Sequence, residues 1–351
     1  MILTSLLVLT LCLPGTSFSH NAPEVGSLTT LWKGYIGKVR DGDLKGALSF
    51  WNEAERKRYL EESIFDWQTQ QFLWQNKGLF LSLKDTLLSV EEVDGFTEVT
   101  ISWKVGGKGS GFNEKRYLMK QGNRLCFVSP ARFYDRKCLQ RRVGHIIYYY
   151  LPGRAIALDK LGENEKYYSK LTLLFKLPKR SIDFYVVDSQ TEVAEILGSG
   201  GYFGPLAFSN FGVVFSKNEY QPHEIAHSVL YPLSHRPIHF ISEGSAAYLE
   251  PTSERRIARA KQYLQGHPDF DISSITDEKI FAAGKETQDL HYDLAASFVK
   301  YLITTYGIDK FKQLYSNSST ENGFNESVNS LSGRDMAQFS KEWKQYLLRE
   351  S

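Results

Sequence analysis

The chain has 351 residues, of which 42% are hydrophobic, 14% aromatic and 23% charged, so it can build sizeable cores and is not disordered as a whole. Its 42 Lys and Arg against 40 Asp and Glu leave a net charge of +2, without the concentrated basic excess of a nucleic-acid-binding protein. At about 150 residues per domain, the length predicts two domains. Three cysteines without a Cys-x-x-Cys pair argue against a disulfide scaffold and a thiolate zinc site.

The first 19 residues have the pattern of a secretory signal peptide. Residues 2–13 form an apolar or hydroxyl-bearing run that is shorter than the about 20 residues of a membrane span, and Ser17 and Ser19 supply the small side chains of a cleavage site. We therefore expect cleavage after Ser19, a secreted or periplasmic protein and no stable membrane insertion; a buried first strand is the alternative. Cys126 and Cys138 would remain, either as a disulfide or as two buried thiols.

Residues 20–140 predict a small α+β accessory domain. Apolar residues recur at helical spacing over 28–62, with a turn at Asp41–Asp43, and strand-like runs with intervening turns follow over 78–130. The stretch from Tyr35 to Tyr59 resembles the cone-shaped family typified by nuclear transport factor 2 and ketosteroid isomerase. No Asp or His in this region is placed for catalysis, so we expect a structural or binding role.

Residues 141–351 predict a second domain with a small sheet and a mainly helical C-terminal half. Strand-like runs at 145–150 and 182–187 flank a helical pattern over 155–175, which indicates a crossover unit. The uncharged stretch 196–216 is rich in glycine and polar residues, so it predicts loop and strand rather than a membrane span. From there to the end the pattern is helical, and the whole chain is expected to be α+β.

The strongest chemical signal is the run His-Glu-Ile-Ala-His at residues 223–227. On a helix, two histidines four residues apart lie on one face, so both imidazoles can bind the same zinc ion. Glu224 is placed to reach a metal-bound water rather than the metal, and Pro222 suits the first turn of such a helix. The alternative is a surface helix with two solvated histidines.

A second motif, Glu-Gly-Ser-Ala-Ala-Tyr-Leu-Glu, occupies residues 243–250. The two motifs at this separation resemble the gluzincin clan of metallopeptidases, and the form of the second motif resembles the peptidase-MA-like family of that clan. The resemblance implies a zincin-type fold in which His223, His227 and Glu243 bind one Zn²⁺ per chain, with water in the fourth position. It extends through the segment that begins at Tyr292 and through the last helix.

Two features depart from that family. The family usually has Trp near the position of His239, and Ala247 stands where the thermolysin branch has Asp. His235 or His239 could therefore be an additional ligand, although loop histidines are more often ordinary polar residues. The Gly-x-Met-x-Asn sequence of the one-zinc aminopeptidases does not precede the first motif.

Three further assignments have structural alternatives. Glu250, two helical turns after Glu243, either orients a ligand imidazole or ends a helix in solvent. By the resemblance Tyr292 donates a hydrogen bond to the developing oxyanion, and the alternative is a buried aromatic residue. Residues 212–215 are expected either to be the edge strand that pairs with the substrate backbone or to be a plain structural strand.

Together these features predict an exported zinc metallopeptidase that acts on a peptide or protein substrate. Glu224 would be the general base for a metal-activated water and would pass the proton to the leaving amine. The alternative is a non-catalytic binding protein that uses the N-terminal cone, with the zincin domain as a scaffold. A zinc-dependent ester or amide hydrolase also fits the residues, and neither the cleavage mode nor the oligomeric state follows from the sequence.

Overall fold

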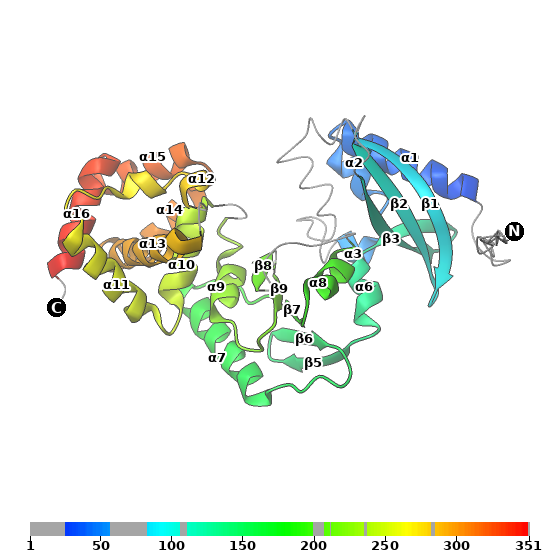
Figure 1. Cartoon of the computed structure of the whole chain (residues 1–351), viewed down its shortest axis with the longest axis horizontal. Coiled ribbons are helices and arrows are strands. Elements are labelled where there is room, and N and C mark those ends of the chain that lie inside the picture. Colours follow the sequence, from blue (N-terminus) through cyan, green and yellow to red (C-terminus); the bar gives the residue numbers. More distant parts are fainter. Residues whose placement is uncertain are drawn as a thin grey trace, which may run out of the picture. The chain divides into compact units, whose positions relative to one another are not determined.

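The described part of the chain forms two compact units, each with its own sheet (Figure 1). The first unit holds the described residues up to Phe133 together with 197–198, and the second holds the others from Tyr134 onward. The computed structural model describes residues 25–56, 83–105, 111–198, 207–210, 212–234, 237–281 and 285–349. The signal peptide expected at 1–19 lies outside these residues and stays a prediction.

The first unit consists of helices followed by an antiparallel sheet, as the sequence predicts. Its four strands are hydrogen-bonded in the order β1-β2-β3-β4. Its elements are α1 (Val25–Arg40), α2 (Leu44–Leu48), α3 (Glu53–Glu55), β1 (Leu83–Val93), β2 (Phe96–Val105), β3 (Gly111–Gln121) and β4 (Arg124–Val128). The expected turn follows α1, where Gly42 adopts a positive φ of 76° and the Asp43 side chain caps α2. Of the region 78–130 in which strands were expected, residues 78–82 and 106–110 lie outside the described residues.

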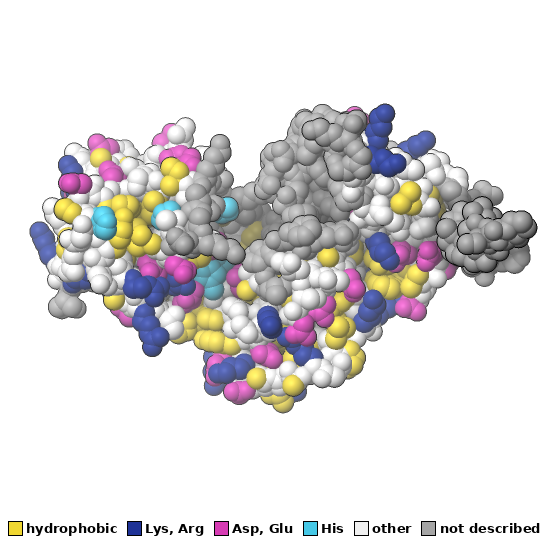
Figure 2. All heavy atoms as spheres, viewed as in Figure 1, with side chains coloured by type: hydrophobic (Ala, Val, Ile, Leu, Met, Phe, Trp, Pro, Cys, Tyr) yellow, Lys and Arg dark blue, Asp and Glu magenta, His cyan; other side chains and the backbone are white. Residues whose placement is uncertain are grey.

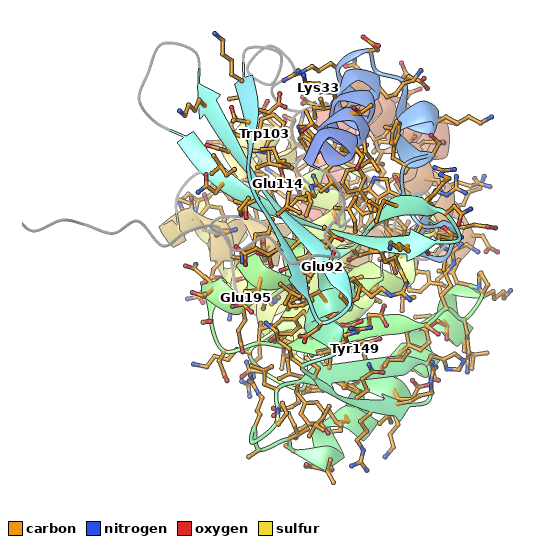
Figure 3. The ribbon with its side chains drawn as sticks, turned by 90° about the vertical axis from the view of Figure 1, so that its right-hand side faces the viewer. Lys33, Glu92, Trp103, Glu114, Tyr149 and Glu195 are labelled. Atoms are coloured by element: carbon orange, nitrogen blue, oxygen red, sulfur yellow. The ribbon has the colours of Figure 1, made fainter. Side chains whose placement is uncertain are left out.

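Aromatic side chains fill the core between α1 and this sheet. Trp32 of α1 contacts Trp103 of β2 edge-on, with ring centroids 5.9 Å apart. A buried indole N–H needs an acceptor, and the Nε1 of Trp103 donates to Glu114 Oε2 over 2.7 Å. Figure 3 shows these two side chains close together on the sheet. The described residues of this unit thus combine a helix-on-sheet core with a buried polar pair, and the resemblance to the cone family stays a prediction.

The second unit contains a five-stranded mixed sheet in the order β5-β6-β7-β9-β8. Its strands are β5 (Leu139–Val143), β6 (Ile146–Tyr150), β7 (Ile182–Val186), β8 (Phe208–Asn210) and β9 (Val213–Ser216). Strands β6, β7 and β9 are parallel, and α7 (Leu158–Phe175) connects β6 to β7 as the expected crossover helix. The domain boundary expected at residue 140 falls within β5, which pairs with β6.

Of the two alternatives for residues 212–215, the structure has the structural strand and not the edge strand. Gly212 has a positive φ of 80°, which allows a tight turn between β8 and β9. Strand β8 therefore pairs antiparallel with β9, while β7 pairs with the other side of β9. The backbone groups of β9 are used within the sheet, and among the described strands β8 is at the edge on this side.

Helices make up most of the second unit outside its sheet, as expected from the sequence (Figure 1). They are α8 (Gln190–Leu197), α9 (Pro222–Leu230), α10 (His239–Leu249), α11 (Ser253–Gly266), α12 (Glu278–Phe281), α13 (Lys285–Tyr306), α14 (Ile308–Asn317), α15 (Glu321–Ser332) and α16 (Met336–Arg349), with a short 3₁₀ turn at Ile272–Ile275. Helix α13 lies in the core, where Leu294, Phe298 and Leu302 are fully buried. Among the described residues, no helix has both the length and the apolar character that a membrane span requires.

Cys126 and Cys138 are both free thiols. Cys126 is buried on β4, and Cys138 is half-buried just before β5. Burial raises the pKa of the Cys138 thiol to about 12, and the nearby carboxylate of Asp135 adds to this effect. Of the two alternatives that the sequence left open, the structure has two separate thiols.

Candidate metal centre

The two histidines of the first motif lie one turn apart on α9 and face Glu243 of α10. The apolar side of α9, which includes Ile225 and Val229, packs into the core, so the imidazoles emerge together on the opposite side. Pro222 is at the first position of the helix. Nε2 of His223 lies 3.0 Å from Glu243 Oε2, Nε2 of His227 lies 3.4 Å from the same oxygen, and the two nitrogens are 3.2 Å apart.

This donor set fits a tetrahedral zinc ion. Ligand bonds of about 2.0–2.1 Å in a tetrahedron place neighbouring ligand atoms about 3.3 Å apart, and the three observed separations are 3.0, 3.2 and 3.4 Å. Two imidazole nitrogens and one carboxylate oxygen are also the ligand types that zinc takes at catalytic sites. Among the described residues, His223, His227 and Glu243 are the group of His, Cys, Asp or Glu side chains that could hold a metal ion.

The electrostatics of the site favour a positive charge among these side chains. Burial by itself would lower the pKa of His223, but hydrogen bonds to Glu243 and Glu250 outweigh it and raise the pKa to about 10. Burial would raise the pKa of Glu243, whereas the charge of His227 and hydrogen bonds to both imidazoles hold it well below its usual value. The carboxylates that favour a charged imidazole favour a bound cation for the same reason.

Glu250 lies just beyond the end of α10 rather than on its face. Helix α10 ends at Leu249, and Glu250 has the extended ψ of 146° at the C-cap. From there its Oε1 lies 2.6 Å from Nδ1 of His223. Its second oxygen accepts from Arg256 Nε over 3.4 Å, and Arg256 also contacts the buried Asp293 over 3.2 Å. Glu250 is therefore hydrogen-bonded to Nδ1 of His223, while Nε2 of the same ring faces Glu243.

Ser242 contacts the other imidazole, and the sequence motifs did not predict this role. Its Oγ lies 3.3 Å from Nδ1 of His227. The fully buried phenol of Tyr315, on α14, is hydrogen-bonded to the same serine. Ser242 directly precedes Glu243, but adjacent residues on a helix point in different directions, so the sequence carried no signal for this contact. Each imidazole thus has a partner at Nδ1 and presents Nε2 to the common centre.

Glu224 and Tyr292 complete the surroundings of this centre. Glu224 is only 7% exposed and directly follows His223 on α9. The ring of Tyr292, on α13, is parallel to that of His223 with centroids 6.1 Å apart. The Tyr292 oxygen accepts from Gln288 Nε2 over 3.3 Å, and burial followed by the charge of Glu243 raises the pKa of its phenol.

Of the two additional histidines that the sequence offered as ligands, the structure describes only His239, which does not join this group. His239 is the first residue of α10 and is exposed, and it is not among the side chains that could hold the metal. His235 lies outside the described residues. Histidine side chains are visible at the surface over the helical part of the second unit (Figure 2).

Gly244 allows α10 and α13 to approach closely next to the site. A Cβ at this position would lie 2.7 Å from Ala295 Cβ and 2.8 Å from its backbone, closer than real contacts allow. Glu243 and Tyr292 are carried by these two helices, so the distance between the helices sets the distance between the side chains.

Replacing Gly244 by alanine is therefore expected to lower the free energy of unfolding by about 1–3 kcal/mol, because the helices must separate. Urea denaturation would measure it. Gly162→Ala on α7 is the matched control, since a Cβ added there would meet no atom within 4 Å, and alanine should stabilise that helix by about 0.5–1 kcal/mol. Equal effects of the two substitutions would show that α10 and α13 do not depend on Gly244.

Residues 177–349 match the Peptidase MA superfamily. No curated protein matches the chain. The matched region includes α9, α10 and α13, and hence the three side chains that could hold a metal together with Glu224 and Tyr292. This match supports a zincin-like metallopeptidase family for residues 177–349.

Proposed function

We propose that the protein is a zinc-dependent metallopeptidase that hydrolyses peptide bonds with Glu224 as the general base. The observation that carries this proposal is the convergence of three ligand atoms, from His223, His227 and Glu243, at the separations of a tetrahedral zinc site. It lies within the region that matches the Peptidase MA superfamily, and a buried carboxylate and a phenol lie beside it.

His223, His227 and Glu243 would hold the zinc ion. When bound, zinc lowers the pKa of a water to about 7 and polarises a carbonyl group. Glu224 can accept a proton from the attacking water and pass it to the leaving amine, because its carboxylate is buried beside the ligands and does not belong to the ligand group. Glu250 and Ser242 would hold the two imidazole rings in place through their Nδ1 atoms.

Tyr292 can stabilise the oxyanion by donating its phenol proton to the carbonyl oxygen as that atom becomes negative. Its raised pKa keeps the proton on the phenol at neutral pH, so the donor is available. The ring is held by stacking against Phe281, with centroids 5.6 Å apart, and by its parallel position to His223. These contacts belong to the ring and not to the hydroxyl.

A buried Glu224 favours a hydrolase over a binding protein with a zincin scaffold. Glu224 directly follows the candidate ligand His223 and does not belong to the ligand group, and a protein that only binds has no chemical need for a general base at this position. We also propose that the mature protein is exported after cleavage following Ser19. N-terminal sequencing of protein isolated from the producing cells would test this, and retention of Met1 would contradict it.

The parent protein provides the direct test of the proposed activity. We expect about one zinc per chain by mass spectrometry of the purified protein, as for a site with three protein ligands. A peptide library should be cleaved, the cleavage should stop with 1,10-phenanthroline, and added zinc should restore it. Cleavage that is indifferent to the chelator, or a protein that binds no zinc, would contradict the proposal.

Tyr292→Phe is expected to lower kcat and kcat/KM together by about 10²- to 10³-fold while KM changes little, because the hydrogen bond strengthens only in the transition state. Zinc content and stability should stay close to the parent, since the stacked ring is retained. Steady-state kinetics and thermal unfolding of this variant decide the role. Intact turnover with stability lowered by about 1 kcal/mol would indicate a structural tyrosine.

A further inference from the structure

Helix α7 precedes the region that matches the Peptidase MA superfamily, yet two of its side chains contact segments of the metal centre. The match begins at residue 177, and α7 ends at Phe175. Asn164 and Tyr167 lie one turn apart on its buried side. Asn164 contacts the segment that enters α9, and Tyr167 contacts the end of α10.

Asn164 is fully buried and holds the backbone on the way into α9. Its Nδ2 donates to the carbonyl of Glu219 over 2.6 Å and to the hydroxyl of Tyr148 over 3.1 Å, and its Oδ1 accepts from the N–H of Gln221 over 3.1 Å. Gln221 is the N-cap residue of α9 and makes no side-chain capping bond. The amide of Asn164 therefore fixes the chain two residues before His223.

Tyr167 holds the backbone at the end of α10, next to Glu250. Its hydroxyl donates to the carbonyl of Leu249 over 2.7 Å, and Leu249 is the last residue of α10. The next residue is Glu250, whose Oε1 lies 2.6 Å from Nδ1 of His223. Helix α7 is thus hydrogen-bonded both to the start of α9, which carries His223, and to the end of α10, which precedes Glu250. The hydrogen bond between His223 and Glu250 links these two segments to each other.

We propose that Asn164 and Tyr167 are positioning residues of the metal centre, which hold His223 and Glu250 at hydrogen-bonding distance. This rests on the proposed function only in requiring that His223 binds the metal. A ligand imidazole is oriented by the partner of its other nitrogen, and a shift of either backbone segment would lengthen that hydrogen bond. Substitution of the direct partner of a ligand imidazole weakens metal binding about 10- to 100-fold, so residues that act through that partner should reach the lower end of this range.

Two conservative substitutions and one matched control test this role in the full-length protein. Tyr167→Phe removes only the hydroxyl that contacts Leu249. Asn164→Asp keeps the acceptor for Gln221 and replaces the donor to Glu219 by an oxygen. The control is Tyr168→Phe, because the neighbouring hydroxyl donates to the Arg180 carbonyl over 2.8 Å and accepts from the Arg180 N–H over 2.7 Å, and it contacts neither α9 nor α10.

The readouts are Zn²⁺ affinity, measured by competition with a chromophoric chelator, and the visible absorption spectrum of the Co²⁺-loaded protein. We expect Tyr167→Phe and Asn164→Asp each to weaken Zn²⁺ binding about tenfold, which is the lower end of the range for partners of a ligand imidazole. Both substitutions should also shift the Co²⁺ absorption bands. Tyr168→Phe should lower the unfolding stability about as much as Tyr167→Phe does, but it should leave the Zn²⁺ affinity and the Co²⁺ spectrum unchanged. In a Glu250→Gln background, Tyr167→Phe should weaken Zn²⁺ binding no further, because the contact it supports is already altered.

The proposal is overturned if Tyr167→Phe folds and binds Zn²⁺ like the parent, or if Tyr168→Phe weakens Zn²⁺ binding as much as Tyr167→Phe does. If Asn164→Asp does not fold, the comparison of Tyr167→Phe with Tyr168→Phe still tests the positioning role. A parent protein that binds Zn²⁺ but cleaves no peptide would contradict the proposed function, while the same affinity comparison would still decide the positioning role. A parent that binds no Zn²⁺ would overturn both.

Discussion

His227→Ala is expected to abolish stoichiometric zinc binding and, with it, peptide cleavage. The substitution removes one of the three ligand atoms, and the two that remain, from His223 and Glu243, do not complete a site with three protein ligands. We expect the zinc content to fall from about one per chain to less than about a tenth at equimolar zinc, since three-ligand sites need all their ligands for tight binding. Metal analysis after gel filtration would measure it.

His239→Ala is the matched control for this experiment. His239 is exposed at the start of α10 and does not belong to the group that could hold the metal. Its substitution should leave both the zinc content and the cleavage rate at the parent values. The ligand assignment is wrong if His227→Ala binds zinc as tightly as the parent, and His239 becomes the candidate ligand if its own substitution releases the metal.

Glu224→Gln is expected to separate metal binding from catalysis. Glutamine keeps the size of the side chain but cannot accept the proton, so turnover should fall about 10²- to 10⁴-fold, the usual contribution of general acid–base catalysis. The zinc content should not change, because Glu224 does not belong to the ligand group.

Steady-state kinetics, zinc analysis and thermal unfolding of the same preparation would test this prediction. Glu254→Gln on α11 is the control, since its carboxylate is 79% exposed and contacts only Lys300, over 3.7 Å, among the ion pairs of the described residues. It should be active like the parent. Unchanged turnover of Glu224→Gln would contradict the mechanism, and a loss of zinc would place Glu224 among the ligands.

Features that depend on neighbours in the chain could be predicted from the sequence. The pairing of His223 with His227 follows from the helical period, because residues four apart lie on one face of any helix. The turn after α1 and the crossover helix between β6 and β7 follow from turn residues and hydrophobic periodicity, which also act over short distances. The signal peptide and the cone-like resemblance stay predictions.

Features that depend on where an element ends were decided by packing. Glu250 was expected on the face of a helix two turns after Glu243, but α10 ends at Leu249, and the side chain reaches His223 from the C-cap. Residues 212–215 were open to interpretation as an edge strand, but a turn at Gly212 adds β8 outside β9. Local pattern locates a helix or strand and leaves its end to the contacts it makes.

The side chains around the metal centre come from distant parts of the chain. Glu250 contacts His223 across 27 residues, Asn164 contacts Gln221 across 57, and Tyr167 contacts Leu249 across 82. The sequence by itself determined which residues can bind a metal, because that property belongs to a residue type and a helical spacing. Only the tertiary structure decided which side chains hold those ligands, because a hydrogen bond between distant segments depends on how the helices pack and leaves no periodic signal in the sequence.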